Sequence, residues 1–433
     1  MNNSFMDKFA MFAAKLGNEI HLRSLRDAFA TLMPLYILAG LAVLLNNTVF
    51  TWIFTGDTLA AVQYWGNLIT NATLNVSGLL VAGVIGYSLA TNRQFENPVS
   101  AAVISMACLI AMMPQTVAVT PVGAEAAVDV SGVLPFANLG TGAMFAGIFV
   151  ALLATELFIK LSNVKQLKIN LGDNVPPAVG KSFNVLIPVC LVLVIFAIVS
   201  ALLFNLTGMN VINLITTFIQ EPLRKIGCSL GGCLVLYTLG NLLWLFGIHQ
   251  SVIYSSILEP LLIINITENI AAYQAGTAIP NIINVSQVTT FGLMGGSGST
   301  ICLIIATFLI GKNAMTKNVA KLSVAPGIFN INEPVIFGYP IVYNVTMAVP
   351  FVLVPALGIL ISYVATAVGF INPCVALVPW TTPVFLSAFL ATGGDWRAIL
   401  VQAVILVLGI LIYMPFVKIN DKVLASQAAE ENK

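Results

Sequence analysis

The sequence predicts an all-α polytopic membrane protein with about ten transmembrane helices and with re-entrant hairpins. Of its 433 residues, 58% are hydrophobic and only 8% are charged, whereas a soluble domain has about 25% charged residues. So little charge cannot cover a soluble fold of this size with polar surface. Each membrane-spanning helix needs roughly 20 apolar residues, which sets the number of spans. The net charge of +1 gives no indication of a nucleic-acid partner.

Long apolar runs define two sets of five candidate spans. The first set is expected at residues 29–50, 74–91, 97–114, 141–160 and 183–207, and the second at 229–248, 251–267, 287–311, 343–370 and 398–417. Before the first span, Phe5, Phe9, Phe12 and Leu16 recur at helical spacing. That spacing predicts an amphipathic helix lying on the membrane surface.

The basic residues predict the orientation of the chain. When both termini are placed in the cytoplasm, all but three of the 18 Lys and Arg residues fall in cytoplasmic segments, the exceptions being Arg224, Lys225 and Arg397. The outer loops expected at 51–73 and 115–140 contain no Lys or Arg. This asymmetry favours a multi-pass protein with both termini in the cytoplasm.

Two apolar stretches are interrupted by proline and glycine and do not fit simple spans. Residues 322–342 follow a cytoplasmic cluster of lysines and predict a re-entrant hairpin, because irregular backbone is tolerated at membrane depth where it lines a cavity. Residues 371–392 have the same broken character on the outer side. Broken segments indicate the substrate site of a transporter, so we place the site in the second half.

This organisation predicts four parts. They are a cytoplasmic amphipathic segment (1–28), an N-terminal membrane domain with a scaffold or oligomerisation role (29–207), an interfacial connector (208–228) and a C-terminal substrate-binding transport domain (229–433).

Two polar residues in the second half are candidates for chemistry. Glu333 lies between Asn332 and Pro334 in the first broken stretch, and an ionisable group at membrane depth indicates a functional site. Its carboxylate would bind sugar hydroxyls or accept a proton; the alternative is that it caps a half-helix. His249 ends the sixth span, and a neutral imidazole suits a hydroxyl ligand, although a histidine at a helix end is often only interfacial.

Other residues leave the interpretation open. Trp244 and Trp380 offer ring faces that pack on sugars, but tryptophan is also common at membrane interfaces. The run GGSGST at 295–300 lacks the lysine of a phosphate-binding loop, so close helix packing or a kink in the eighth span is the preferred interpretation. A role for Glu259 stays open. The six cysteines form no ligand or disulfide pattern, and we expect neither a metal nor a cofactor.

Several motifs together resemble a known family. WLFGIHQS at 244–251, GGSGST at 295–300 and GIFNINEPVIFGYPI at 327–341 are similar to the membrane component, enzyme IIC, of bacterial phosphoenolpyruvate-dependent sugar phosphotransferase systems. The match is to its lactose/cellobiose/diacetylchitobiose class. HLRSLRDAFATLMPLYILAG at 21–40 and PWTTP at 379–383 extend the resemblance almost from end to end.

The resemblance implies an enzyme IIC fold of the glucose superfamily in the bacterial cytoplasmic membrane. It implies a homodimer formed by the first five spans and a disaccharide bound in the second half. Glu333, Asn332 and His249 would contact sugar hydroxyls, and Trp244 and Trp380 would be platforms for the rings. The family usually has glycine after this histidine; Gln250 stands there instead and would lie beside the sugar.

The resemblance also implies partners and a mechanism. The last span is followed by no segment like the phosphorylated IIB or IIA domains, so we expect a separate phospho-IIB, supplied indirectly by IIA, HPr and enzyme I, to phosphorylate the 6-hydroxyl of the translocated sugar. Whether the chain itself counts as an enzyme stays open, because it carries no phosphorylated residue. The alternatives are a proton-coupled secondary sugar transporter, with an intramembrane carboxylate as its proton site, and a non-transporting membrane sensor.

Overall fold

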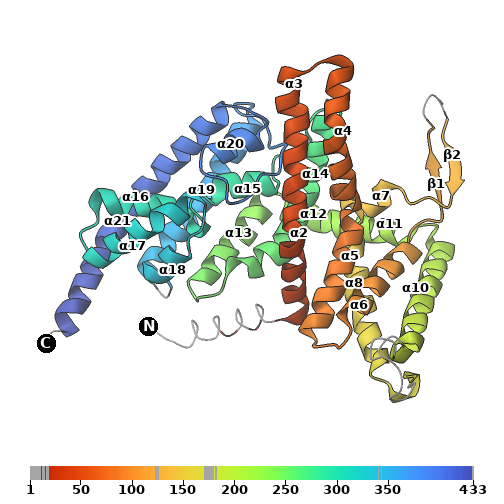
Figure 1. Ribbon diagram of the computed structural model, residues 1–433. Helices are drawn as coiled ribbons and strands as arrows, with labels where there is room; N and C mark the ends of the chain where they lie inside the picture. Colours follow the sequence, from red (N-terminus) through yellow and green to blue (C-terminus); the bar gives the residue numbers. More distant parts are fainter. Residues whose placement is uncertain are drawn as a thin grey trace. The chain divides into compact units, whose positions relative to one another are not determined.

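The computed structural model describes residues 11, 15, 19–121, 126–169, 180, 183–339, 341, 342 and 344–431. Most of these residues are helical (Figure 1), as the fold class predicts. The surface helix expected within residues 1–28 lies mainly outside the described residues.

Eight helices in the described part of the chain are long and apolar enough to cross a membrane. They are Ile20–Ile53, Gly56–Asn92, Thr141–Ser162, Leu186–Thr207, Gln250–Gln274, Val285–Ile310, Thr346–Ala367 and Arg397–Ser426. A ninth is added if the bent pair Val211–Gly227 and Leu230–Trp244 forms one span. The chain is therefore a multi-pass helical protein, and the expected number of ten spans stays a prediction.

The described residues form two compact units. The smaller unit comprises Asn18–Leu35 and Thr70–Leu223, and the larger unit comprises Tyr36–Ile69 and Arg224 onward. Helix α2 (Ile20–Leu44) contributes its first part to the smaller unit and its second part to the larger one. The division of roles between the parts predicted from the sequence stays a prediction.

The smaller unit is a helical bundle whose centre is packed tightly around glycines. Its helices are α5 (Ser77–Asn92), α6 (Pro98–Ala111), α7 (Phe136–Leu139), α8 (Met144–Ser162), α10 (Leu186–Thr207) and α11 (Val211–Ile215). A Cβ atom on Gly86 of α5 would lie 2.5 Å from Ser105 Oγ of α6, and one on Gly147 of α8 would lie 2.5 Å from Gly78 O of α5. Such close approaches allow van der Waals packing, which holds helices together in lipid, where no hydrophobic effect acts between them.

Both stretches expected as outer loops contain regular structure, and their position on the outer side stays a prediction. Residues 51–73 include the helix α4 (Gly56–Ala72). The sequence did not indicate this helix, because the polar side chains of that stretch are typical of a loop. Its Gln63 exchanges two hydrogen bonds with Asn46. Asn46 Nδ2 donates to Gln63 O at 2.8 Å, and Gln63 Nε2 donates to Asn46 O at 2.9 Å. Residues 115–140 contain the antiparallel strands β1 (Thr116–Val119) and β2 (Val128–Ser131), whose β-branched residues favour a hairpin.

The larger unit surrounds an aromatic and aliphatic core. Its helices are the second part of α2, α3 (Phe50–Ile53), α4, most of α12 (Glu221–Gly227), α13 (Leu230–Trp244), α14 (Glu259–Gln274), α15 (Val285–Gly292), α16 (Thr300–Ile310), α17 (Ala314–Ile328), α18 (Glu333–Gly338), α19 (Val345–Ala367), α20 (Leu386–Ala391) and α21 (Arg397–Glu431). Trp244, Tyr339, Phe351 and Tyr413 are all buried in one cluster. Helices α16, α19 and α21 form most of its frame (Figure 1).

The two broken stretches have different structures. In 322–342, helix α17 continues past Pro326 to Ile328, the chain turns at 329–332, and α18 begins at Glu333. In 371–392, the chain is irregular until α20. Side chains from other segments bind its carbonyl groups: Asn269 Nδ2 donates to Cys374 O (2.9 Å) and Ser286 Oγ to Ala376 O (2.8 Å). Irregular backbone is tolerated here because it is buried in protein. Whether either stretch is re-entrant stays a prediction.

Candidate substrate site

The centre of the candidate site is the loop between α15 and α16, whose sequence is GGSGST. Gly295, Gly296 and Gly298 have φ angles of +76°, +98° and +74°, which glycine adopts without steric cost. There is also no room for a side chain: a Cβ atom on Gly296 would lie 2.4 Å from Asn332 Cγ, and one on Gly298 would lie 2.2 Å from Phe351 Cδ2. The predicted kink in this span is confirmed as a break between two helices.

Two asparagines in the turn between α17 and α18 bind this loop. Asn332 is buried, and its Nδ2 donates to Ser297 O at 2.7 Å. Asn330 has a left-handed φ of +61°, a conformation in which asparagine is enriched. Its Oδ1 accepts from Gly295 N at 2.7 Å, and its Nδ2 donates to Trp380 O at 2.6 Å and to Thr382 O at 3.0 Å. One side chain therefore ties together three breaks in the backbone.

Trp244 links the loop to the predicted histidine. Its side chain is buried at the end of α13, and Nε1 donates to Ser297 Oγ at 3.0 Å. The centre of its ring lies 4.6 Å from that of His249 and 6.2 Å from that of Phe337 in α18. The indole thus holds the imidazole in place and touches the helix that begins with Glu333.

His249 is exposed and has a defined tautomer. Its Nδ1 accepts a hydrogen bond from Ser251 N at 3.0 Å and lies 2.8 Å from Ser251 Oγ. A neutral imidazole that accepts at Nδ1 carries its proton on Nε2. In that tautomer, Nε2 is the donor of the ring.

Glu333 is the first residue of α18, directly after Asn332. The side chain is exposed, and its predicted position at membrane depth stays a prediction. The turn at 329–332 brings it to the surface of the unit instead of burying it between helices. The exposed carboxylate follows Asn332 directly and stands four residues before Phe337, which packs on Trp244.

The two remaining predicted residues lie at the edges of this cluster. The indole of Trp380 is 43% exposed, and only its backbone oxygen is bound by Asn330. Gln250 is buried against α13, with its Cβ 3.7 Å from an ideal Cβ position on Gly240. Its Oε1 accepts no hydrogen bond from the described residues.

Sequence reasoning missed the residues that hold the site together. Ser297 accepts from Trp244 and Asn332, and Asn330 binds three backbone groups. The available signals were the clustered glycines and the pair of asparagines in FNINEP, but neither indicated which segments they would join. A buried carboxyl group, Glu259 at the start of α14, lies outside this chain of contacts.

The chain is similar to several known proteins over almost its whole length. The family model of the phosphotransferase system, EIIC, matches residues 26–355. The oligo-beta-mannoside-specific EIIC component of Bacillus subtilis (strain 168) is 33% identical over 97% of this chain and 94% of that protein. The cellobiose-specific EIIC component of Geobacillus stearothermophilus is 32% identical over 98% of this chain and 94% of that protein.

The fold is also similar to that of a solved structure. The crystal structure of the transporter ChbC, the IIC component from the N,N'-diacetylchitobiose-specific phosphotransferase system, matches with a TM-score of 0.90 at 31% identity and covers 99% of both chains.

Proposed function

Because the chain belongs to the EIIC family of the phosphotransferase system, we propose that it is the membrane-embedded sugar permease of such a system. It binds a disaccharide of the cellobiose or β-glucoside, diacetylchitobiose or lactose type. A separate phosphorylated IIB protein transfers its phosphoryl group to the 6-hydroxyl as the sugar crosses the membrane. The observation that carries this proposal is the continuous series of contacts from His249 through Trp244, Ser297 and Asn332 to Glu333.

The chemistry assigns a role to each end of this series. The bond between phosphorus and the cysteine sulfur of IIB breaks, a bond from phosphorus to the sugar O6 forms, and the hydroxyl proton passes to Glu333. Such transfer depends mainly on positioning and charge stabilisation, so His249 Nε2 serves to orient the hydroxyl. The product keeps the negative charge of the phosphate and cannot return through the apolar bundle.

The aromatic side chains divide into a support and a platform. The ring of Trp244 is almost fully covered, by His249 among others, so it positions the imidazole in this conformation. Trp380 offers the accessible ring face on which a pyranose can pack. Residues 229–433 thus hold the sugar, 29–207 form the scaffold and the homodimer, and 208–228 connect them; a rigid-body shift exposes the sugar to the cytoplasm.

The test is uptake of radiolabelled cellobiose into membrane vesicles, with and without IIB, IIA, HPr, enzyme I and phosphoenolpyruvate inside. We expect labelled cellobiose 6-phosphate to accumulate only with the complete set. Glu333→Gln removes the proton acceptor and keeps the shape, and we expect phosphorylation to fall by about 100-fold or more, since general-base catalysis contributes 10²–10⁴-fold. The matched control is Asp57→Asn, which removes one exposed carboxylate in α4.

Two results would reject the proposal. If Glu333→Gln phosphorylates sugar at the wild-type rate, the carboxylate has no part in the transfer. If free cellobiose accumulates without the partner proteins and is lost when the proton gradient collapses, the chain is a secondary transporter. Glu259, which is buried, and Glu333 would then be the candidate proton sites. No uptake with any of a panel of disaccharides would favour a non-transporting sensor.

A further inference from the structure

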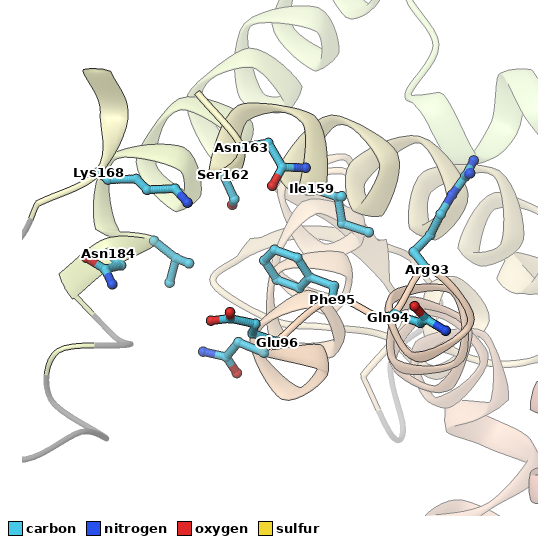
Figure 2. Close-up of a pocket in the computed structure, with 11 residues that line it drawn as sticks. Arg93, Gln94, Phe95, Glu96, Ile159, Ser162, Asn163, Lys168 and Asn184 are labelled. Carbon is cyan, nitrogen blue, oxygen red and sulfur yellow. The ribbon is translucent and has the colours of Figure 1, made fainter. Parts of the chain in front are cut away.

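Two adjoining cavities lie at the end of α8 in the smaller unit, whereas the candidate substrate site belongs to the larger unit. One is polar, has a volume of about 290 Å³ and is shown in Figure 2. The other follows the side of α8 and has a volume of about 620 Å³. Arg93, Ile159 and Asn163 line both of them, so the two cavities are neighbours.

The polar cavity combines one ammonium group with many hydrogen-bonding groups. In Figure 2 the Lys168 side chain extends toward Ser162, and Glu96 lies across the cavity from them. Amide side chains, among them Asn163 and Asn184, line the same space. Ser162 is 4% exposed, and its Oγ has no hydrogen-bond partner among the described residues. A buried hydroxyl normally has a partner, so this group, which lines the cavity, is a candidate donor to a polar ligand.

The second cavity is partly apolar. Leu153, Leu157 and Ile159 line it along one side of α8, and Leu153 is 63% exposed. The charged residues of this cavity, Arg93, Glu156 and Lys160, lie toward the end of the helix that the basic-residue pattern places in the cytoplasm. A polar compartment next to an apolar groove fits a ligand with a head group and an acyl chain.

The charges favour an anionic head group. The guanidinium of Arg93 is paired with Glu156, with Nη2 and Nε 2.6 and 3.0 Å from Oε1. His21 Nε2 lies 3.0 Å from the same carboxylate oxygen. Lys160 and Lys168 form no ion pair with the described carboxylates, and both are exposed. Together the cavities are lined by three basic and two acidic residues.

We propose that this pair of cavities binds an anionic glycerophospholipid with a polyhydroxylated head group, of the phosphatidylglycerol type. The phosphate lies at the Lys168 ammonium group and the Ser162 hydroxyl. Lys160, which lines the adjoining cavity, adds a second positive charge. Glu96 and the asparagine amides accept from and donate to the glycerol hydroxyls. One acyl chain follows Leu153 and Leu157 along α8. Basic pockets between helices at the cytoplasmic leaflet recognise lipids of this charge.

Native mass spectrometry of the purified full chain with added phosphatidylglycerol tests this site. The variant Lys160→Gln/Lys168→Gln removes two cations, each worth about 1 kcal/mol for an anionic lipid. We therefore expect the affinity for the first bound lipid to fall about ten- to thirtyfold. The matched control, Lys312→Gln/Lys317→Gln, removes two lysines of the larger unit and should leave that affinity within twofold of the wild type.

A second variant tests the acyl groove without changing charge. Leu157→Trp fills the space along α8 and should weaken phosphatidylglycerol binding while thermal unfolding stays close to that of the wild type. Three outcomes would overturn the proposal. They are equal lipid affinity in both double variants, equal binding of phosphatidylcholine by the wild type, and displacement of the lipid by millimolar inorganic phosphate, which would indicate a simple anion site.

Discussion

Replacing Asn330 should destabilise the larger unit, because its side chain joins three breaks in the backbone. The side chain is 7% exposed and forms three hydrogen bonds, from Gly295 N at 2.7 Å and to Trp380 O and Thr382 O at 2.6 and 3.0 Å. Leaving a buried donor or acceptor without a partner costs about 1–3 kcal/mol. The loss of the acceptor for the Gly295 N–H accounts for most of this cost, because a carbonyl group tolerates the loss of a donor better. We therefore expect Asn330→Gly to cost about 3 kcal/mol.

Two variants at this position separate the hydrogen bonds from the backbone conformation. Glycine accepts the φ of +61° freely, whereas alanine in a left-handed conformation adds about 1–2 kcal/mol. Asn330→Ala should therefore lose about 4–5 kcal/mol. At 2–4 °C per kcal/mol for a domain of this size, Asn330→Gly should lower the midpoint of thermal unfolding by about 6–12 °C, and Asn330→Ala should lower it further.

The assay is thermal unfolding of the detergent-purified protein, followed by intrinsic tryptophan fluorescence. The side chain of Trp380 is exposed and its backbone is bound by Asn330, so its emission should change in the same transition. If Asn330→Gly unfolds within about 1 °C of the wild type, the three hydrogen bonds do not hold the breaks together. If the alanine and glycine variants unfold at the same temperature, the left-handed conformation is not retained.

Two further predictions concern other parts of the larger unit. Gly296→Ala should abolish sugar binding or folding, because its Cβ would lie 2.4 Å from Asn332 Cγ; substrate-dependent thermal stabilisation measures this, and a variant that binds normally would contradict it. Burial alone would raise the pKa of the Asp395 carboxyl group. The hydrogen bonds from Arg397 and from the backbone N–H of Asn372 outweigh this effect and hold the pKa below its ordinary value of 3.8. The carboxylate therefore stabilises the fold above about pH 4, so the stability lost in Asp395→Asn should be largest near neutral pH. Unfolding midpoints from pH 7 to pH 3 should converge between variant and wild type, and a constant difference would exclude this linkage.

Composition and apolar run length sufficed to predict the membrane class and most of the helices. These features depend on the solvent around each segment, which the sequence records directly. Helix α4 was missed because its polar side chains, such as Gln63, resemble those of an outer loop; in the structure Gln63 pairs with Asn46. Local spacing is also insufficient for Glu156, which stands one helical turn before Lys160 and binds Arg93 and His21.

The candidate site was predictable only in part, for a related reason. The ionisable residues Glu333 and His249 stand out in an apolar chain, so the sequence identified the region. The contacts that join them run through Ser297 and Asn330, which bind backbone groups far away in the sequence. Hydrogen bonds to backbone leave no pattern of residue types at the accepting end. The exposure of Glu333 was likewise unpredictable, because the turn at 329–332 decides it.

The hydrogen bonds that join these breaks in the backbone have a consequence for transport. The N–H of Gly295, the carbonyl of Ser297 and those of Trp380 and Thr382 lie where no helix supplies a partner, and the two asparagines of one turn satisfy all four. Moving any one break alone would strand buried polar groups at a cost of several kcal/mol. We therefore expect the loop, the turn and the irregular stretch to move together. A sugar held there would be carried by displacement of the whole assembly of breaks, since opening a single hairpin would leave these backbone groups without partners.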